Sequence, residues 1–372
     1  MMTSVERMTT VFQGNLPDRV PFFPTIYTDH ACHACGHSFE ETLINPALSN
    51  DMMLGAARRY ETDVVRFVFG PGDAWREQKE VRTENEKLVQ FDRASGRAEG
   101  TFDVQGGGVF CPYEMPEPIQ TVGQANDIPV PSAAEWEQEG RMHDVKRCVS
   151  EAREHGLFTV GLCGGQTLNF MVAKLGSSEA ALLCFYDDPA LALAVIAKGV
   201  ALSVEKGKAY IAAGVDAVYI GDSYASGSVI SPDIYERFCA PAYKELAQEL
   251  HRLGAFVYKH CCGNYNPLLE GLAEVGVDAM DGIDPTSGMS VAHTKRVIGD
   301  RLTLMGGISC MNLLNGTPES VYEEAAQCIA EGKPGGRYVL GSACAVPRCA
   351  PPENLDAAKQ AILDHGEYSE RH

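Results

Sequence analysis

Short apolar runs alternate with longer helical patterns along the chain, and this alternation constrains the fold more than any other feature. A run rich in β-branched residues followed by a helix is the repeating unit of parallel βα folds. Eight such runs occur, apolar almost throughout, as is typical of strands covered on both faces. Eight is the strand number of a (β/α)8 (TIM) barrel, so we predict an α/β protein of that class. The predicted strands are Val20–Ile26, Val64–Phe69, Phe158–Cys163, Ala217–Gly221, Ala255–His260, Ala279–Ile283, Leu302–Gly306 and Tyr338–Gly341.

The connection between the second and third runs is much longer than the others. From Gly70 to Arg147, the glycines Gly106–Gly108 and a series of prolines interrupt any helical or strand period. We interpret residues 70–147 as an insertion after the second strand, with an antiparallel excursion at Leu88–Phe91 and Glu99–Val104. The insertion is either a surface decoration or a cover for an active site. We predict that residues 1–372 form one barrel domain carrying this insertion.

Composition limits the partners of such a barrel. The net charge of −19 repels nucleic-acid phosphates and anionic membranes. No apolar run approaches the roughly 20 residues of a membrane helix, and residues 1–15 lack the pattern of a secretory signal. We therefore expect a cytoplasmic protein that binds neither nucleic acid nor membrane. The 13 cysteines then predict reduced thiols, available for packing or metal binding, rather than disulfides.

Two candidate metal ligands stand where the fifth predicted strand ends. The strand Ala255–His260 runs directly into Cys261 and Cys262, at the end of the strands where barrels carry their catalytic residues. Residues two apart on an extended segment point to the same side, so His260 and Cys262 can share a metal while Cys261 points elsewhere. Cys344 follows the last predicted strand and can supply a third ligand.

One imidazole and two thiolates favour zinc over magnesium or calcium. Three protein ligands with one open position are typical of a catalytic zinc site. The alternative is that these residues are only buried thiols and a core histidine. The candidates for a fourth, oxygen ligand in the resting state are Asp222, Asp281 and Asp284, which lie near the strand ends.

A second group of histidines and cysteines follows the first predicted strand: His30, Cys32, His33, Cys35 and His37. Its Cys-x-x-Cys spacing fits a second metal or redox site. The alternative, which we adopt, is a loop that faces the substrate cavity without binding metal. His30 and His33 are then candidate substrate contacts.

Polar side chains after the third and fourth strands complete the candidate pocket. Asn169 and Gln166 either bind a polar part of the substrate or cap a helix. Asp222 either orients a metal-bound histidine or caps the next helix, and the Ser-Gly-Ser run that begins at Ser226 lines the pocket or only forms a turn. The candidate substrate-binding residues are His30, His33, Asn169, Tyr219, Asp222, Tyr224 and Ser226.

Four motifs follow one another along the chain: Leu16–Pro21, Ala225–Pro232 with Tyr235, Phe238 and Pro241 after it, Met305–Ile308, and Pro352–Leu355. Together they resemble the uroporphyrinogen decarboxylase superfamily, and the resemblance extends from Leu16 to the end of the chain. It implies a single barrel and an enzyme.

Two features distinguish the branches of that superfamily. The run His260-Cys261-Cys262-Gly263 with Cys344 looks like the zinc signature of the methylcobamide:coenzyme M methyltransferase branch, whereas the decarboxylases use no metal. The decarboxylases carry an Arg-Gln-Ala-Gly-Arg stretch after the first strand, whose arginines engage tetrapyrrole carboxylates; the corresponding Tyr27–Gly36 contains no arginine. The resemblance therefore favours a methyltransferase.

For this chain the resemblance implies that His260, Cys262 and Cys344 hold zinc and form the catalytic centre. A thiol such as coenzyme M, or another methyl acceptor, would take the open position and receive a methyl group from a methylated corrinoid, of which methylcobalamin is the free form. No Asp-x-His-x-x-Gly corrinoid-binding run occurs here, so a corrinoid protein is the expected partner. The alternatives are a metal-free carboxy-lyase of the decarboxylase type and a non-catalytic, zinc-stabilised binding barrel, which would unfold when metal is removed.

Overall fold

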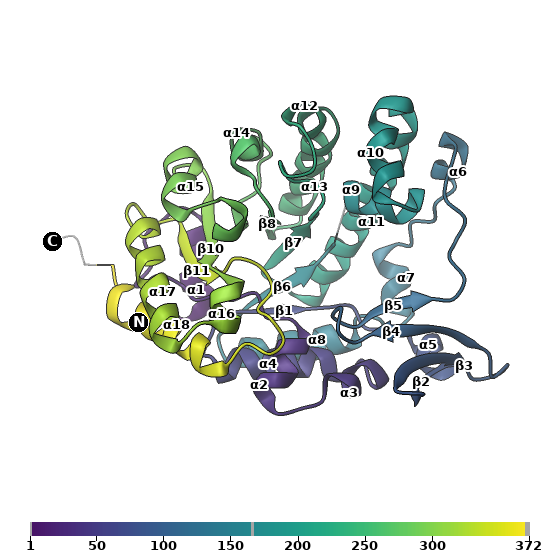
Figure 1. Ribbon diagram of the computed structural model, residues 1–372, viewed down its shortest axis with the longest axis horizontal. Coiled ribbons are helices and arrows are strands. Elements are labelled where there is room, and N and C mark those ends of the chain that lie inside the picture. Colours follow the sequence, from purple (N-terminus) through teal and green to yellow (C-terminus); the bar gives the residue numbers. More distant parts are fainter. Residues whose placement is uncertain (1, 165–166, 369–372) are drawn as a thin grey trace.

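A ring of parallel strands forms the centre of the computed structural model, which describes residues 2–164 and 167–368 (Figure 1). Seven strands pair in parallel, each with its neighbour in the order β1-β6-β7-β8-β9-β10-β11. Nearly all of their residues are buried, as expected for strands covered on both faces. The predicted barrel class is confirmed. The strands are β1 (Val64–Phe67), β6 (Phe158–Leu162), β7 (Ala217–Gly221), β8 (Phe256–His260), β9 (Ala279–Ile283), β10 (Thr303–Ile308) and β11 (Tyr338–Ser342).

The eighth position of the ring is filled by residues 20–26, which were predicted as a regular strand and form only isolated bridges. The segment contains Pro21 and a second proline three residues on, and proline has no N–H to contribute to a ladder. Its remaining groups still join both neighbours. The N–H of Phe23 donates to Leu340 of β11 (2.8 Å), and the N–H of Asp63, just before β1, donates to the carbonyl of Phe22 (2.9 Å). The extended segment therefore closes the ring.

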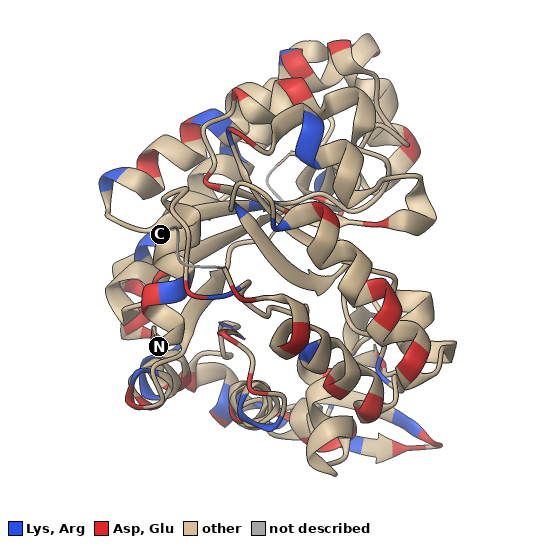
Figure 2. Ribbon diagram, turned by 90° about the vertical axis from the view of Figure 1, so that its left-hand side faces the viewer, with Lys and Arg blue, Asp and Glu red and all other residues tan. Residues whose placement is uncertain are grey.

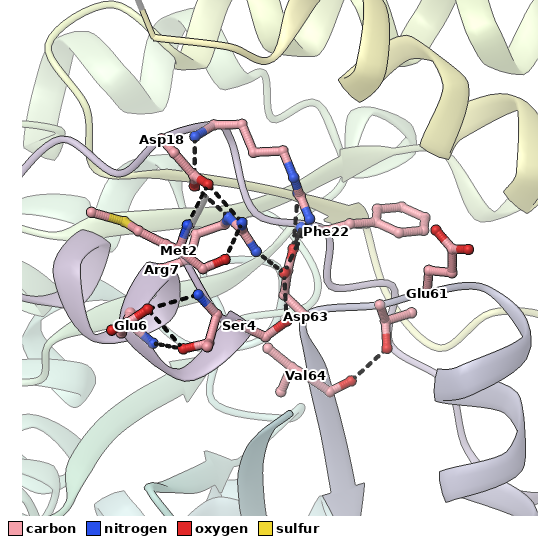
Figure 3. A network of polar contacts seen from close by, with 12 residues as sticks. Met2, Ser4, Glu6, Arg7, Asp18, Phe22, Glu61, Asp63 and Val64 are labelled. Atoms are coloured by element: carbon pink, nitrogen blue, oxygen red, sulfur yellow. Dashed lines mark hydrogen bonds and ion pairs between the residues drawn. The ribbon is translucent and has the colours of Figure 1, made fainter. Parts of the chain in front are cut away.

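Asp63, just before β1, binds the N-terminal segment through hydrogen bonds and ion pairs (Figure 3). Its carboxylate is 1% exposed and accepts hydrogen bonds from the Ser4 hydroxyl (2.8 Å), Arg7 (2.6 Å), Arg19 (3.0 Å) and the N–H of Phe22 (2.7 Å). A buried charge is tolerated only when it is paired and hydrogen-bonded, and this one is saturated. Because Asp63 precedes β1, the network lies at the opposite end of the barrel from the predicted active site.

Helices cover the outside of the ring (Figure 1), and most of the charged residues belong to these helices and to loops rather than to the central strands (Figure 2). The helix predicted over residues 189–213 is α11, with Asp188 capping its start by accepting from the N–H of Leu191 (3.0 Å). The other helices are α1 (Ser4–Phe12), α2 (Thr28–Cys35), α3 (Phe39–Ile44), α4 (Leu48–Arg59), α5 (Asp73–Gln78), α6 (Val122–Asn126), α7 (Ala133–Gln138), α8 (His143–Glu154), α9 (Leu168–Leu175), α10 (Ser178–Asp187), α12 (Pro232–Ile234), α13 (Ala240–Arg252), α14 (Leu269–Ala273), α15 (Val291–Ile298), α16 (Cys310–Asn315), α17 (Pro318–Gly332) and α18 (Pro352–His365).

Within the described ranges, no single helix combines the length and apolarity of a membrane span; α9 and α10 meet those criteria only as a pair bent by 105°.

The connection after β1 forms a separate antiparallel sheet on the side of the molecule away from the two chain ends (Figure 1). It has four strands rather than the single excursion predicted, because further residues pair on both sides of β3 and β4. α8 packs against α4 and β6 as part of the barrel, and it begins at His143, inside the predicted boundary at 147. The single-domain division of residues 1–372 stays a proposal. The strands are β2 (Lys79–Glu84), β3 (Lys87–Asp92), β4 (Ala98–Asp103) and β5 (Val109–Pro112).

Candidate metal centre

The structure brings His260, Cys262 and Cys344 together at the mouth of the barrel. His260 is the last residue of β8, Cys262 follows it, and Cys344 follows β11. Their ligand atoms all lie within 4.8 Å of one another, and no other group of three or more His, Cys, Asp or Glu side chains in the described ranges is so arranged. Carboxyl ends of parallel strands meet at one edge of a barrel, which is why residues 84 apart converge here.

The spacing of these atoms fits a zinc ion. Zn–S bonds of about 2.3 Å and Zn–N bonds of about 2.0–2.1 Å in a tetrahedron place sulfur and nitrogen roughly 3.6 Å apart. The distance from His260 Nε2 to Cys344 Sγ is 3.6 Å. His260 is buried, whereas both cysteines are half-buried. The donor set of two sulfurs and one nitrogen is therefore suited to zinc, with a fourth position left for another ligand.

Asp281 of β9 orients His260. Its Oδ2 lies 3.1 Å from His260 Nδ1 and also accepts a hydrogen bond from Arg66 of β1 (2.9 Å). Burial works to raise the pKa of Asp281, but His260 and Arg66 outweigh it and hold that pKa below its usual value. The ionised carboxylate can only accept, so Nδ1 carries the proton and Nε2 faces the cysteines. This carboxylate–histidine pairing is common around catalytic zinc.

Neighbouring charges and hydrogen bonds shift the pKa values of all three residues of the cluster. Burial works to lower the pKa of His260, but Asp281 and Cys344 outweigh it and raise the pKa to about 9. A hydrogen bond with Cys262, helped by His260 against the effect of burial, lowers the pKa of Cys344 to about 4. The same bond, together with burial, raises the pKa of Cys262. These shifts favour the thiolate form of Cys344, which is the form in which a cysteine binds a metal ion.

The loop after β8, residues 261–263, which we call the ligand loop, directs Cys261 and Cys262 to opposite sides, as predicted. Cys261 is fully buried, and its sulfur contacts the carbonyl of Lys259 (3.6 Å) on the other side of the strand from the cluster. Gly263 has φ +88°, and a Cβ there would lie 2.8 Å from Ser226 Oγ. Only glycine fits a position that is both left-handed and this close to its neighbour. The loop therefore turns sharply against the segment after β7.

His30 and His33 lie on α2, a helix where a loop was predicted. His30 is buried, with Nδ1 3.1 Å from the Pro347 carbonyl and Nε2 3.0 Å from the Tyr60 hydroxyl. Both ring nitrogens are engaged, so His30 has none to offer a substrate, while His33 is exposed on the helix surface. Burial raises the pKa of the nearby Cys32 to about 12. The arrangement does not support a metal or redox site here.

Asp222 and Asn169 have structural partners. Both oxygens of Asp222 are taken, by the N–H groups of Thr167 (2.7 Å) and Asn169 (2.9 Å), at the start of α9. Of the two roles predicted for Asp222, the structure shows the helix cap rather than the partner of a metal-bound histidine. Its side chain is buried, with the residue 1% exposed. The Asn169 side chain joins Ser223 (3.2 Å) and the N–H of Tyr224 (3.0 Å), fixing the segment after β7. Gln166 lies outside the described residues.

The remaining pocket candidates differ in exposure. The Tyr219 ring lies beside the His260 imidazole, with centroids 5.7 Å apart. Ser226 is buried beneath the ligand loop, whereas Tyr224 is 42% exposed. The third candidate oxygen ligand, Asp284, accepts from the N–H of Thr286 (2.9 Å) and caps a short 3-10 turn.

A cavity of about 380 Å³ lies at the carboxyl end of the barrel strands. Its lining includes Tyr27, Val68 and Ala345, which follow the carboxyl ends of three adjacent positions in the ring, and Ala345 adjoins Cys344. Gly107 of the β4–β5 loop also lines it. The insertion thus borders the mouth, which favours a cover over a decoration.

Sequence reasoning missed the roles of Asp281 and Arg66. Asp281 was considered only as an oxygen ligand, and Arg66 was counted within an apolar run. A signal was present for both: each is the one charged residue of its predicted strand, Val64–Phe69 or Ala279–Ile283. A charge on a strand buried on both faces needs a partner across the barrel.

These observations define a class: a (β/α)8 barrel with an open His-Cys-Cys cluster at its catalytic end. The chain belongs to the uroporphyrinogen decarboxylase (URO-D) family, whose model matches residues 105–365. The resemblance noted from the motifs is confirmed.

Relatives of two kinds are found. A methylated-thiol–coenzyme M methyltransferase of Methanosarcina mazei is 32% identical over 178 residues, 48% of this chain and 46% of the relative. A methylcobamide:CoM methyltransferase MtaA of Methanosarcina barkeri is 30% identical over 40% of this chain and 42% of its own length. A uroporphyrinogen decarboxylase of Alkalilimnicola ehrlichii is 27% identical over 70% of this chain and 72% of its own. The match therefore spans about half the length of the methyltransferases, and the relatives support an enzyme of this family.

Among solved structures, a methyltransferase from Methanosarcina mazei superimposes with a TM-score of 0.73. The comparison covers 98% of this chain and 99% of that one at 22% identity, and it shows the shared fold.

Proposed function

We propose that the protein is a zinc-dependent methyltransferase that moves a methyl group from a methylated corrinoid to a thiol, such as coenzyme M, or to another methyl acceptor. The observation that carries the proposal is the cluster of His260, Cys262 and Cys344, whose 3.6 Å nitrogen–sulfur distance matches a tetrahedral zinc site. Relatives named as coenzyme M methyltransferases support it.

The residues of the centre have distinct parts. His260, Cys262 and Cys344 would hold the ion and leave one position toward the mouth. Zinc bound there would lower the pKa of an incoming thiol, so that a thiolate is available at neutral pH. Asp281 keeps His260 in the orientation that presents Nε2, and Tyr219 packs beside the imidazole. The cavity beside Ala345 gives the acceptor a place to bind, and a corrinoid carried by a partner protein would approach the open mouth.

Decarboxylation, the other chemistry among the relatives, finds less support in the site. The region that corresponds to the arginine-bearing stretch of the decarboxylases is α2, which contains no arginine. Arg66 is nearby in the barrel, but it is fully buried and committed to Asp281. A polycarboxylate substrate would therefore find neither an arginine on α2 nor a free Arg66 with which to pair.

The test is elemental analysis of the purified protein beside two variants purified identically, His260→Ala and His30→Gln. We expect about one zinc per chain in the wild type and in His30→Gln, whose histidine is buried away from the cluster, and none in His260→Ala. Methylcobalamin with a panel of thiols then measures methyl transfer. Absence of zinc from the wild type, or full transfer without zinc, would contradict the proposal and favour a metal-free lyase.

Chelation separates this proposal from a zinc-stabilised binding barrel. Since the cluster joins β8 and β11 at the open end of an already closed ring, we expect a chelator to abolish transfer while the circular dichroism of the barrel persists. Unfolding in step with zinc loss would instead indicate a structural metal.

A further inference from the structure

Arg66 is a buried charge inside the barrel. It projects from β1 to Asp281 of β9, with Nη2 2.9 Å from Oδ2, and the two side chains are 1% and 2% exposed. β1 and β9 are four places apart in the ring order. With residues 20–26 as the eighth position, these strands stand opposite each other, so the ion pair spans the interior of the barrel next to His260.

Aromatic rings enclose the guanidinium. Its carbon lies 4.6 Å from the ring centre of Phe23, 5.3 Å from that of Tyr219, 5.7 Å from that of Tyr27 and 5.8 Å from that of Tyr258. Nε and Nη1 have no hydrogen-bond partner among the described residues. Ring faces attract cations and supply the remaining contacts. Arginine does not lose its charge in proteins, so Asp281 is held beside a permanent, immobile cation.

Asp281 in turn contacts one proposed metal ligand, His260, and the residue that precedes another, Cys261. Its Oδ2, which Arg66 contacts, also lies 3.1 Å from His260 Nδ1. Its backbone carbonyl accepts from the N–H of Cys261 at 2.7 Å, next to the ligand Cys262. A displacement of Asp281 would therefore disturb two of the three ligands.

We propose that Arg66 is a positioning residue for the metal centre, acting through Asp281 to fix the orientation of His260. The inference rests on the proposed zinc site and adds to it a residue on the opposite wall of the barrel. Tyr219 extends the same arrangement, since its ring lies beside both the guanidinium and the imidazole.

The test measures the dissociation constant for zinc by competition with a chelator, together with the melting temperature. We expect Arg66→Met to raise the zinc Kd about 10–100-fold, the range found when residues that orient metal ligands are changed. The matched control is Arg7→Met, which removes another buried arginine paired with aspartates, at the far end of the barrel. It should lower the melting temperature and leave the zinc Kd unchanged. An unchanged Kd in folded Arg66→Met would overturn the proposal.

A second comparison does not depend on the folding of that single variant. Asp281→Asn removes the carboxylate charge and leaves the guanidinium without its partner, whereas the double variant Arg66→Met/Asp281→Asn removes both members of the ion pair. If Arg66 acts through Asp281, both bind zinc more weakly than the wild type and with the same Kd. If the double variant binds zinc more weakly than Asp281→Asn, or as tightly as the wild type, Arg66 does not act through Asp281. If the wild-type protein contains no zinc, the proposed metal site itself is wrong, which is a different result.

Discussion

Asp63→Asn tests how strongly the N-terminal segment is fastened into the ring. Oδ1 of Asp63 accepts hydrogen bonds from the Ser4 hydroxyl and the Arg7 guanidinium. Oδ2 accepts from the Arg19 guanidinium and the N–H of Phe22. In asparagine, one of these oxygens becomes an NH2 group, which faces donors whichever way the amide turns. The variant thus loses at least one charge-assisted and one neutral hydrogen bond in a buried site, a cost of about 2–4 kcal/mol.

The assay is thermal unfolding at a matched scan rate. An unfolding entropy of about 2.1 cal/mol/K per residue over 372 residues converts that cost into a decrease in melting temperature of about 3–5 °C. The control is Asp356→Asn, which breaks an ion pair with Arg59 whose side chains are 45% and 43% exposed; it should cost about 1 kcal/mol or less. Zinc content should not change in either variant. A melting temperature for Asp63→Asn equal to that of the control would refute the reasoning.

Two further predictions concern the metal ligands and the pH dependence of stability. Cys262→Ala and Cys344→Ala should each lower bound zinc and methyl transfer together while the barrel stays folded. The control Cys261→Ala, which changes a sulfur outside the cluster, should keep both zinc and transfer. Retention of zinc by Cys262→Ala or Cys344→Ala would contradict the ligand assignment. Burial works to raise the pKa of Asp18, but hydrogen bonds from Arg7 and a backbone N–H lower it to about 2, from 3.8. The stabilisation that the ionised Asp18 carboxylate gives the fold is therefore present above about pH 4 and is lost as the pH falls toward 2. In urea titrations, Asp18→Asn should lower the free energy of unfolding by about 1–2 kcal/mol at pH 7 and by almost nothing near pH 2. A loss that does not change with pH would show that it does not come from the ionised carboxylate.

Much of the fold follows from patterns that are local in sequence. Seven of the eight predicted strands form at the predicted places because apolar, β-branched runs leave few other ways to bury themselves. The exception, residues 20–26, shows the limit of such patterns. Its composition predicts a strand, yet Pro21 and the second proline remove the donors of a ladder. α2 was taken for a loop because its His-Ala-Cys residues have no strong helical periodicity.

The ligand triad was predictable for a geometric reason, since carboxyl ends of parallel strands converge whatever their separation in sequence. The residues behind the triad were not. Whether Asp222 or Asp281 faces His260 depends on which side of its strand each carboxylate occupies and on what else competes for it. Asp222 accepts a hydrogen bond from the backbone at the start of α9, whereas Asp281 points into the barrel and pairs with Arg66. Such assignments require the packed barrel.

The closure of the ring by residues 20–26 also sets an order of events during synthesis. The backbone N–H of Thr25 donates a hydrogen bond to the Ser342 hydroxyl, a contact between residues 317 positions apart. Until β11 has left the ribosome, residues 20–26 lack one neighbour and the edge strands have unpaired N–H and C=O groups that invite association with other chains. Cys344 emerges just after β11, so the closing contact and the third metal ligand become available almost together. A nascent chain therefore cannot acquire a complete metal centre before it is able to close its barrel.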